Sequence, residues 1–410
     1  MFSEEVVEEK KYNFDSPVMQ VRAVTSFITL SKDRSTWEAE ISRAAHFDAT
    51  VATALQQAGY IVQTLRIVTN PFGEYLDTSS EAAALEGMKF LASILSGSTM
   101  PKLRIRFAIG AATTQQELTL VPALITKYGD LANVCVNISV DDLGVPDKAM
   151  TTAAAQVVRE LADNTPQGEG NFNFTANFNC PPLIPYFPAG YNTDKNVFCV
   201  GLEYPDLLVQ VLQDQPSPLD WDKAFVTMQA AVQSHVDTIT SIANQCSKEG
   251  SVPFAGLDSS PAPRKDIHSM CEVFKLLGAE FGSSGTLAAC AYLTRLFKSV
   301  QGVPLVGFSG LMLTCLEDSG MAASAAQGHY NVTMLNAYSA VCGIGLDCVP
   351  IPGDISSDII ERLMKDTGTL AFRLNKPLTV RLFPCPGLKA GDMTKFTSPD
   401  LCNCTVFDVK

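Results

Sequence analysis

The chain has 410 residues, of which 46% are hydrophobic and 18% are charged, and its formal net charge is −13 at pH 7. This is the composition of an ordinary globular protein, and a chain of this length buries enough surface to fold without disulfides. The acidic balance and the lack of a basic stripe exclude nucleic acid as a partner and argue against an anionic membrane surface. The sequence contains no run of about 18 uncharged apolar residues, so it predicts no transmembrane helix.

The N-terminus and the cysteines indicate the compartment. Residues 1–18 are rich in glutamate and are predicted to form a flexible acidic arm, without the apolar region of a signal peptide. The chain contains twelve cysteines, which without a secretory signal are expected to be reduced thiols. We therefore expect a cytoplasmic protein in which residues 19–410 form one large α/β domain.

Strand and helix patterns alternate along this domain. Runs rich in β-branched residues predict ten strands, at 21–30, 61–69, 103–109, 133–140, 197–202, 252–257, 303–308, 346–351, 378–383 and 405–409. Helical spacing of apolar residues predicts helices that include 36–58, 81–95, 115–128 and 220–246. The alternation predicts a largely parallel sheet covered on both faces. The aromatic and proline-rich stretch 171–193 fits neither pattern and is predicted to be an ordered insertion or lid.

Four polar segments follow predicted strands or open predicted helices, at 256–265, 282–286, 307–321 and 345–354. Ligands of α/β proteins bind at the carboxyl ends of parallel strands, so these segments are predicted to converge on one pocket. The alternative for each segment is a helix cap or a turn without a ligand.

Three carboxylates in these segments are the predicted catalytic residues: Glu317, Asp318 and Asp347. Adjacent carboxylates can divide the roles of acid and base, or can hold a divalent cation such as Mg²⁺. Glu317 and Asp318 are the candidate metal ligands. The alternative is an acidic helix start, which the helix dipole favours.

The predicted substrate-binding residues supply cations, amides and backbone donors. Arg66 and the helix start at Gly285 and Thr286 suit an anionic group, and Asn137 and Asn177 suit orientation of a substrate. The full set is Arg66, Asn137, Asn177, Asp258, Gly285, Thr286, Ser309 and Gly310. No phosphate-binding loop or dinucleotide motif occurs.

These residues predict an enzyme of the lyase, isomerase or cyclase type that acts on a small, partly apolar or anionic metabolite. The chemistry would be carboxylate acid–base catalysis or metal assistance. The alternative is a non-catalytic metabolite-binding or sensor protein, because a fold alone does not decide between the two.

The order of these segments resembles the family catalogued as domain of unknown function 711, also called uncharacterised protein family 0210. The resemblance covers residues 19–407 and rests on the segments at 65–71, 134–138, 174–177, 185–190, 258–263, 285–286, 307–310, 317–321, 345–354, 380–381 and 391–393. It implies an α/β barrel of about ten strands, like the pyruvate formate-lyase-like barrel of glycyl-radical enzymes, with helices outside. It also suggests self-association as a homodimer. Radical chemistry is not expected, because 380–387 lacks the characteristic glycine loop.

Overall fold

The structure, a computed structural model, describes residues 18–409. The predicted acidic arm at 1–18 therefore lies outside the described residues, except for Val18. None of the helices within 18–409 combines the length and the apolar character that crossing a bilayer requires. All twelve cysteines lie in this part of the chain and are free thiols, as predicted.

The elements alternate along the chain as the sequence predicts. The strands are β1 (Gln20–Ile28), β2 (Val62–Thr69), β3 (Ile105–Ala112), β4 (Asn133–Ile138), β5 (Phe174–Phe178), β6 (Val197–Glu203), β7 (Phe254–Asp258), β8 (Gly345–Pro352) and β9 (Leu378–Cys385). The α-helices are α1 (Trp37–Gln57), α2 (Glu81–Leu95), α3 (Gln115–Tyr128), α4 (Lys148–Asn164), α5 (Pro205–Gln213), α6 (Trp221–Gly250), α7 (Met270–Leu276), α8 (Thr286–Lys298), α9 (Ser319–Ala326), α10 (Val332–Ser339) and α11 (Ser357–Arg373). Short 3-10 helices are η1 (Arg34–Thr36), η2 (Phe72–Glu74), η3 (Gly129–Leu131) and η4 (Pro166–Asn173).

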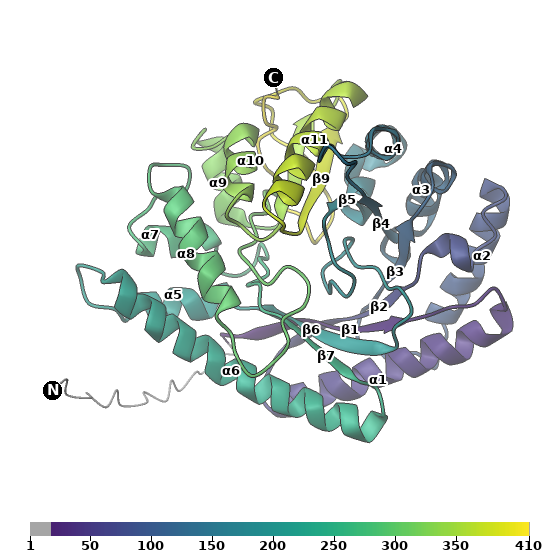
Figure 1. The fold of residues 1–410 in the computed structure, drawn as a ribbon, viewed down its shortest axis with the longest axis horizontal. Helices are drawn as coiled ribbons and strands as arrows, with labels where there is room; N and C mark the ends of the chain where they lie inside the picture. The colour runs from purple at the N-terminus through teal and green to yellow at the C-terminus, as the bar shows by residue number, and fades with distance from the viewer. Residues whose placement is uncertain (1–17, 410) are drawn as a thin grey trace.

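The nine strands form one sheet with the order β7-β6-β1-β2-β3-β4-β5-β9-β8 (Figure 1). Six neighbouring pairs are parallel, which confirms the predicted largely parallel sheet. The β1–β6 and β5–β9 pairs are antiparallel. The five central strands therefore run in one direction, and the two strands at each edge run in the other.

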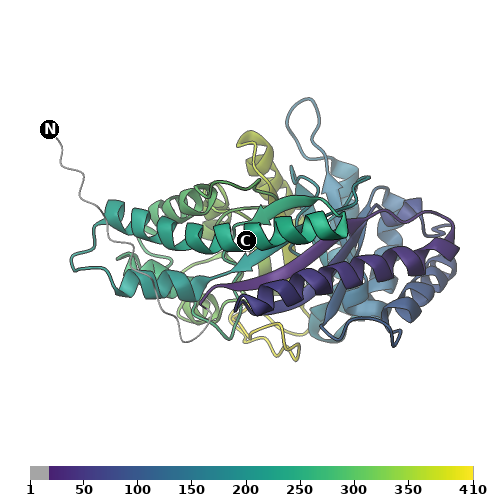
Figure 2. The same cartoon turned by 90° about the horizontal axis from the view of Figure 1, so that it is seen from below.

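The helices surround the sheet on its outer side (Figure 1). The stripe of α6 that the sequence predicts is buried, with Met228, Val232, Val236 and Ile239 on one face. This spacing places an apolar stripe along the helix, so α6 packs against the sheet and alongside α1 (Figure 2).

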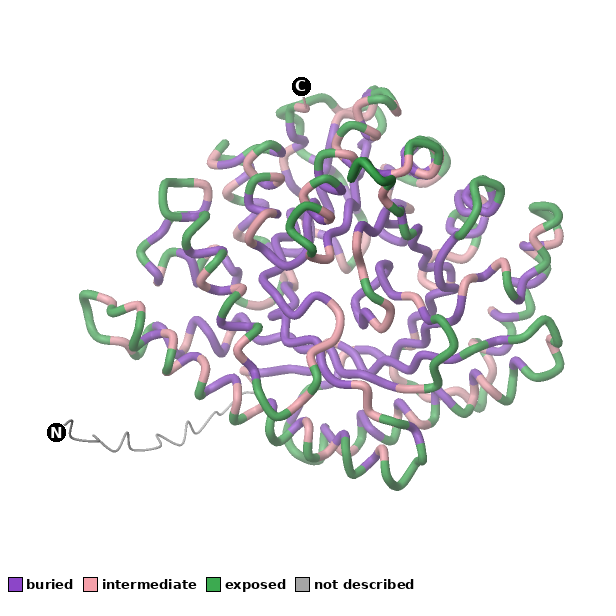
Figure 3. Tube along the Cα trace, viewed as in Figure 1, coloured by how far each residue is buried: buried purple, intermediate pink, exposed green. Residues whose placement is uncertain are grey.

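The inner face of the sheet is covered by two loops rather than by helices, and its centre is buried (Figure 3). In the first loop, 179–196, Tyr186 packs with Phe308 and Met312 of the second loop, 306–317. Phe187 packs on Phe27 of β1. The predicted insertion at 171–193 is thus ordered, but it begins only after Phe178, because the residues before it form β5.

Two predicted strands are absent from the sheet. The stretch 303–308 makes one bridge, from Leu305 to Leu257, and 405–409 makes one bridge, from Thr405 to Met393. Proline at 304 lacks an N–H for a ladder, and Gly307 turns the chain with φ +63°. The chain continues to Thr314, which bridges Asp347 of β8. One irregular segment therefore contacts both edge strands.

Gly307 lies where the second loop approaches Asp258. A Cβ atom at position 307 would lie 2.1 Å from Asp258 Oδ2. Gly302 has a similar backbone, with φ +77°, but no atom lies within 4 Å of its Cβ position. The two glycines therefore separate the cost of the left-handed backbone from the cost of crowding the carboxylate.

We predict that Gly307→Ala destabilises the protein more than Gly302→Ala. Both substitutions pay about 1–2 kcal/mol for the left-handed backbone. Gly307→Ala also displaces a buried, hydrogen-bonded carboxylate, which costs a further 1–3 kcal/mol or so. Urea unfolding of the two variants measures the difference, and equal unfolding free energies would contradict the close contact.

Candidate functional site

A small cavity of about 40 Å³ lies between the inner face of the sheet and the two loops. Its charged lining residues are Arg22, Arg66, Arg106, Arg381, Glu317 and Asp347. Its apolar wall comes largely from the loops and includes Tyr186, Phe187, Phe308, Met312 and Ile344. The side chains of Arg22 and Glu317, which both line the cavity, keep 14% and 11% of their exposure.

The four arginines come from four strands: β1, β2, β3 and β9. Arg66 and Arg106 are direct neighbours in the parallel register of β2 and β3, so both side chains leave the same face of the sheet. Alternation along β2 places Thr64 and Val68 on that face as well, and Val68 packs against Phe187 of the first loop. The strand register thus concentrates positive charge at one point.

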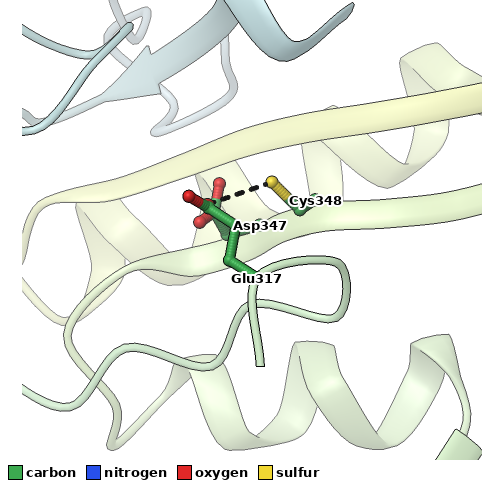
Figure 4. A group of neighbouring side chains, drawn as sticks. All are labelled: Glu317, Asp347 and Cys348. Carbon is green, nitrogen blue, oxygen red and sulfur yellow. Dashed lines mark hydrogen bonds between the residues drawn. The ribbon is translucent and has the colours of Figure 1, made fainter. Parts of the chain in front are cut away.

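Arg381 joins the two cavity carboxylates. Its Nε and Nη2 donate to Oδ1 and Oδ2 of Asp347 at 2.7 and 2.9 Å, and its Nη2 donates to Glu317 Oε2 at 2.6 Å. Cys348 Sγ donates to the same Glu317 oxygen at 3.3 Å (Figure 4). Burial raises the pKa of Asp347 above its ordinary value, although Arg381 opposes this shift. Both carboxylate oxygens of Asp347 accept hydrogen bonds from Arg381.

Glu317 keeps one less engaged oxygen. Its Oε1 lies 3.6 Å from Nη2 of Arg22, and no hydrogen bond from residues 18–409 reaches it. Arg22 in turn contacts Glu203 at 3.2 Å, and Glu203 contacts Arg264 at 3.2 Å. Positive and negative groups thus alternate from the half-exposed Arg264 to the buried Asp347.

Arg66 differs from the other three arginines. Its Nη1 donates to Pro185 O at 2.7 Å and its Nε donates to Thr64 Oγ1 at 3.2 Å, and within residues 18–409 it forms no ion pair. The ring of Phe187 lies 5.0 Å from its guanidinium. Burial, followed by repulsion from Arg106 and Arg22, holds the pKa of Arg66 well below its ordinary value. A buried cation in this state favours an anion beside it.

Two further buried polar atoms belong to cavity-lining residues and have no partner within the described chain: Arg106 Nε and Thr314 Oγ1. Arg106 does pair with Asp130 through Nη2 at 2.9 Å. Buried polar atoms in folded proteins nearly always have a hydrogen-bonding partner. The cavity is large enough for water-sized groups to supply it.

The predicted metal pair does not converge. Asp318 is the N-cap of α9 and accepts from Gly320 N, Met321 N, Met270 N and Ser269 Oγ. The group that lies together is Glu317, Asp347 and Cys348. Arg381 already binds both carboxylates of this group, and burial raises the pKa of the Cys348 thiol well above its ordinary value. This donor set suits a guanidinium better than a hard cation such as Mg²⁺.

Asp258, Ser309 and Gly310 form a hydrogen-bonded corner beside the cavity. Asp258 accepts from Ser260 N, Ser260 Oγ, Phe308 N and Ser309 N at 2.7–3.0 Å. Gly310 N donates to Ser260 Oγ. None of the three lines the cavity; they fix the loop that carries Phe308 and Met312 into it.

Four other predicted residues lie away from the cavity lining. Asn177 is buried and donates to Asn137 Oδ1 and to Ala189 O, so it holds the first loop, while Asn137 is exposed. Gly285 and Thr286 start α8, where Thr286 Oγ1 accepts from Gly282 N. Of the predicted site residues, the cavity brings together Arg66, Glu317 and Asp347.

Sequence reasoning missed Arg22, Arg106 and Arg381 as lining residues. Each stands inside a run of β-branched or aromatic residues, where an arginine interrupts an otherwise apolar strand. Arginines are almost never fully buried without a partner. Their recurrence at the same place in several strands is the signal that would have found them.

The family model described as Uncharacterised ACR (DUF711) matches residues 14–398. The chain belongs to this family, as the resemblance suggests. A UPF0210 protein of Pyrobaculum aerophilum is 31% identical over 59% of this chain and 56% of its own length. A UPF0210 protein of Pyrobaculum arsenaticum is 28% identical over 91% of this chain and 87% of its own length.

Among solved structures, the anaerobic ribonucleotide reductase from Thermotoga maritima, with citrate in the active site, is similar with a TM-score of 0.38. The two chains are 7% identical, and the match covers 88% of this chain and 81% of the other. The similarity is too low to transfer any property of that enzyme to this chain.

We predict that Asp258 makes stability depend on pH. Burial raises its pKa to about 6, although four hydrogen bonds oppose the shift. Because the folded pKa exceeds the unfolded one, the folded chain binds the extra proton, and this group's contribution to stability falls as the pH rises from about 4 through about 6. The fall amounts to about 3 kcal/mol at most.

Urea unfolding between pH 4 and pH 7 measures this effect, with Asp258→Asn as the comparison. The variant is less stable overall, because its amide N–H₂ meets backbone donors, but its unfolding free energy changes less across this range. Identical pH slopes in the two proteins would rule out the assigned titration.

Proposed function

We propose that this protein is an enzyme that acts on a small, anionic and partly apolar metabolite inside the cavity. The proposal rests on Arg66, a buried cation that forms no ion pair with any carboxylate within residues 18–409 and lies beside a second arginine, Arg106. A ligand anion would relieve the unfavourable burial of this charge, and the apolar side chains of the two loops would contact the rest of the molecule.

Glu317 is the proposed general base. Its Oε1 is the less engaged carboxylate oxygen of the cavity and lies 3.6 Å from Arg22 Nη2. Asp347 holds Arg381 with both oxygens and is proposed to position it. Arg381 would then stabilise negative charge that develops on the substrate when a proton leaves. A lyase or isomerase step requires no more than these groups.

The proposed fold around this site is a ten-stranded barrel of the pyruvate formate-lyase-like type. The support is the irregular segment between Leu305 and Thr314, which bridges β7 at one end and β8 at the other. We propose that this segment takes the place of the tenth strand. It would enclose the first loop and exclude water from the cavity.

A second candidate function is metabolite binding without turnover. One observation favours it: three of the four carboxylate oxygens of Glu317 and Asp347 accept hydrogen bonds from Arg381 or Cys348. A carboxylate that is already paired with a guanidinium is a weaker base than a free one.

Incubation of the full chain with a metabolite mixture, followed by mass spectrometry, distinguishes the enzyme from the metabolite-binding protein. The enzyme proposal predicts that wild-type protein changes the mass of a component and that Glu317→Gln slows this change by about 10²-fold or more while the ligand still binds. Asp318→Asn is the matched control, because this neighbouring carboxylate caps α9.

The control is expected to lower stability and to leave turnover by the folded protein unchanged. A ligand that raises the melting temperature without any change in mass would favour the binding protein. Equal turnover by wild type and Glu317→Gln would remove Glu317 from the mechanism.

A further inference from the structure

We infer that the cavity takes a short monocarboxylate, a ligand with one negative charge, held between Arg66 and Arg106. This inference rests on the proposed function and names its substrate class. It comes from the balance of charged contacts around the cavity, from its two unpartnered polar atoms and from its volume.

The first group of charges is balanced. The alternating series of contacts contains three arginines and three carboxylates, with distances from 2.6 to 3.6 Å. Its members, in order of contact, are Arg264, Glu203, Arg22, Glu317, Arg381 and Asp347. Because each cation in it touches at least one carboxylate, this series calls for no ligand charge.

The second group is also balanced. Asp130 contacts both Arg106 and Arg104, and Asp400 contacts Arg104 at 2.8 Å. Two arginines thus face two carboxylates. Arg106 borders the cavity while its charge is already shared, so it can donate a hydrogen bond to a ligand without requiring a full charge from it.

Arg66 is the remaining charge. Within residues 18–409, its contacts are with neutral oxygens and an aromatic ring. Asp258, a buried carboxylate near the loops, accepts four hydrogen bonds from residues 260, 308 and 309 and forms no ion pair within the part of the chain that the structure describes. One negative charge beside Arg66 would therefore supply the carboxylate contact that this guanidinium lacks within residues 18–409, and a second would lie against Glu317 or the apolar wall, where burial of an unpaired charge is costly.

The unpartnered polar atoms and the cavity volume indicate the functional group and the size of the ligand. Arg106 Nε is a donor without a partner among the described residues, and Thr314 Oγ1 can donate or accept, which suits an anionic oxygen. The volume of about 40 Å³ leaves room for about three water-sized groups. A carboxylate with a chain of two to four carbons matches this space, with its apolar end toward Phe308, Met312 and Ile344.

Three probes of the same chain length test the inference: propionate, malonate and the uncharged propionamide. We expect propionate to bind the full chain at least tenfold more tightly than malonate or propionamide, as measured by calorimetry at pH 8. We also expect propionate to raise the melting temperature. Arg66→Gln should weaken propionate binding by at least tenfold, and Arg66→Lys, which keeps the charge, by less.

Arg104→Gln is the matched control, since it removes one arginine charge from a side chain that does not line the cavity. It should change propionate binding by less than threefold. If malonate binds as tightly as propionate, the single-charge inference is overturned and the anion site of the proposed function stands. If propionamide binds equally well, if none of the probes binds, or if Arg66→Gln has no effect, the proposed function itself fails.

Discussion

The burial of arginine charge on the inner face of one sheet is the constraint on which the rest of the structure depends. Moving a guanidinium out of water costs several kcal/mol unless carboxylates or carbonyl oxygens replace the solvent. Three of the four cavity arginines meet this cost with ion pairs to side chains from other elements. The inner face of the sheet can therefore hold these arginines only where neighbouring elements place carboxylates beside them.

The first loop also stabilises the buried arginines. Pro185 O accepts from Arg66, and Phe187 O lies 3.4 Å from Nη1 of Arg381. The rings of Phe172 and Phe187 lie within 6 Å of the guanidinium groups of three arginines, Arg66, Arg106 and Arg381. Aromatic faces attract cations, so Phe187 of the first loop and Phe172 of η4 both stabilise the buried guanidinium groups.

The sequence predicts the elements better than it predicts the site. Eight of the ten predicted strands lie in the sheet, because β-branched runs are a local signal. Phe174–Phe178 was not predicted as a strand, because it lies in the aromatic and proline-rich stretch 171–193, which was predicted to be an insertion or lid. Glu317 and Asp347 were predicted because they are carboxylates in polar segments beside or within predicted strands, and both line the cavity.

Asp318 illustrates the limit of local reasoning. Its adjacency to Glu317 indicates a pair, but the chain turns between them, and the carboxylates leave toward different partners: Arg381 on one side and the start of α7 on the other. Contacts such as Arg22 with Glu203 join residues far apart in sequence. No spacing rule reports them, because they depend on the antiparallel pairing of β1 with β6.

The most direct measurement of the central claim is an anomalous difference map, at the bromine edge, from crystals grown in sodium bromide. Bromide carries one negative charge and needs no specific shape. The account predicts a bromide ion in the cavity, in contact with the guanidinium groups of Arg66 and Arg106, that disappears in Arg66→Gln crystals and persists in Arg104→Gln crystals. Bromide bound only at the outer surface, with no peak beside Arg66, would contradict it.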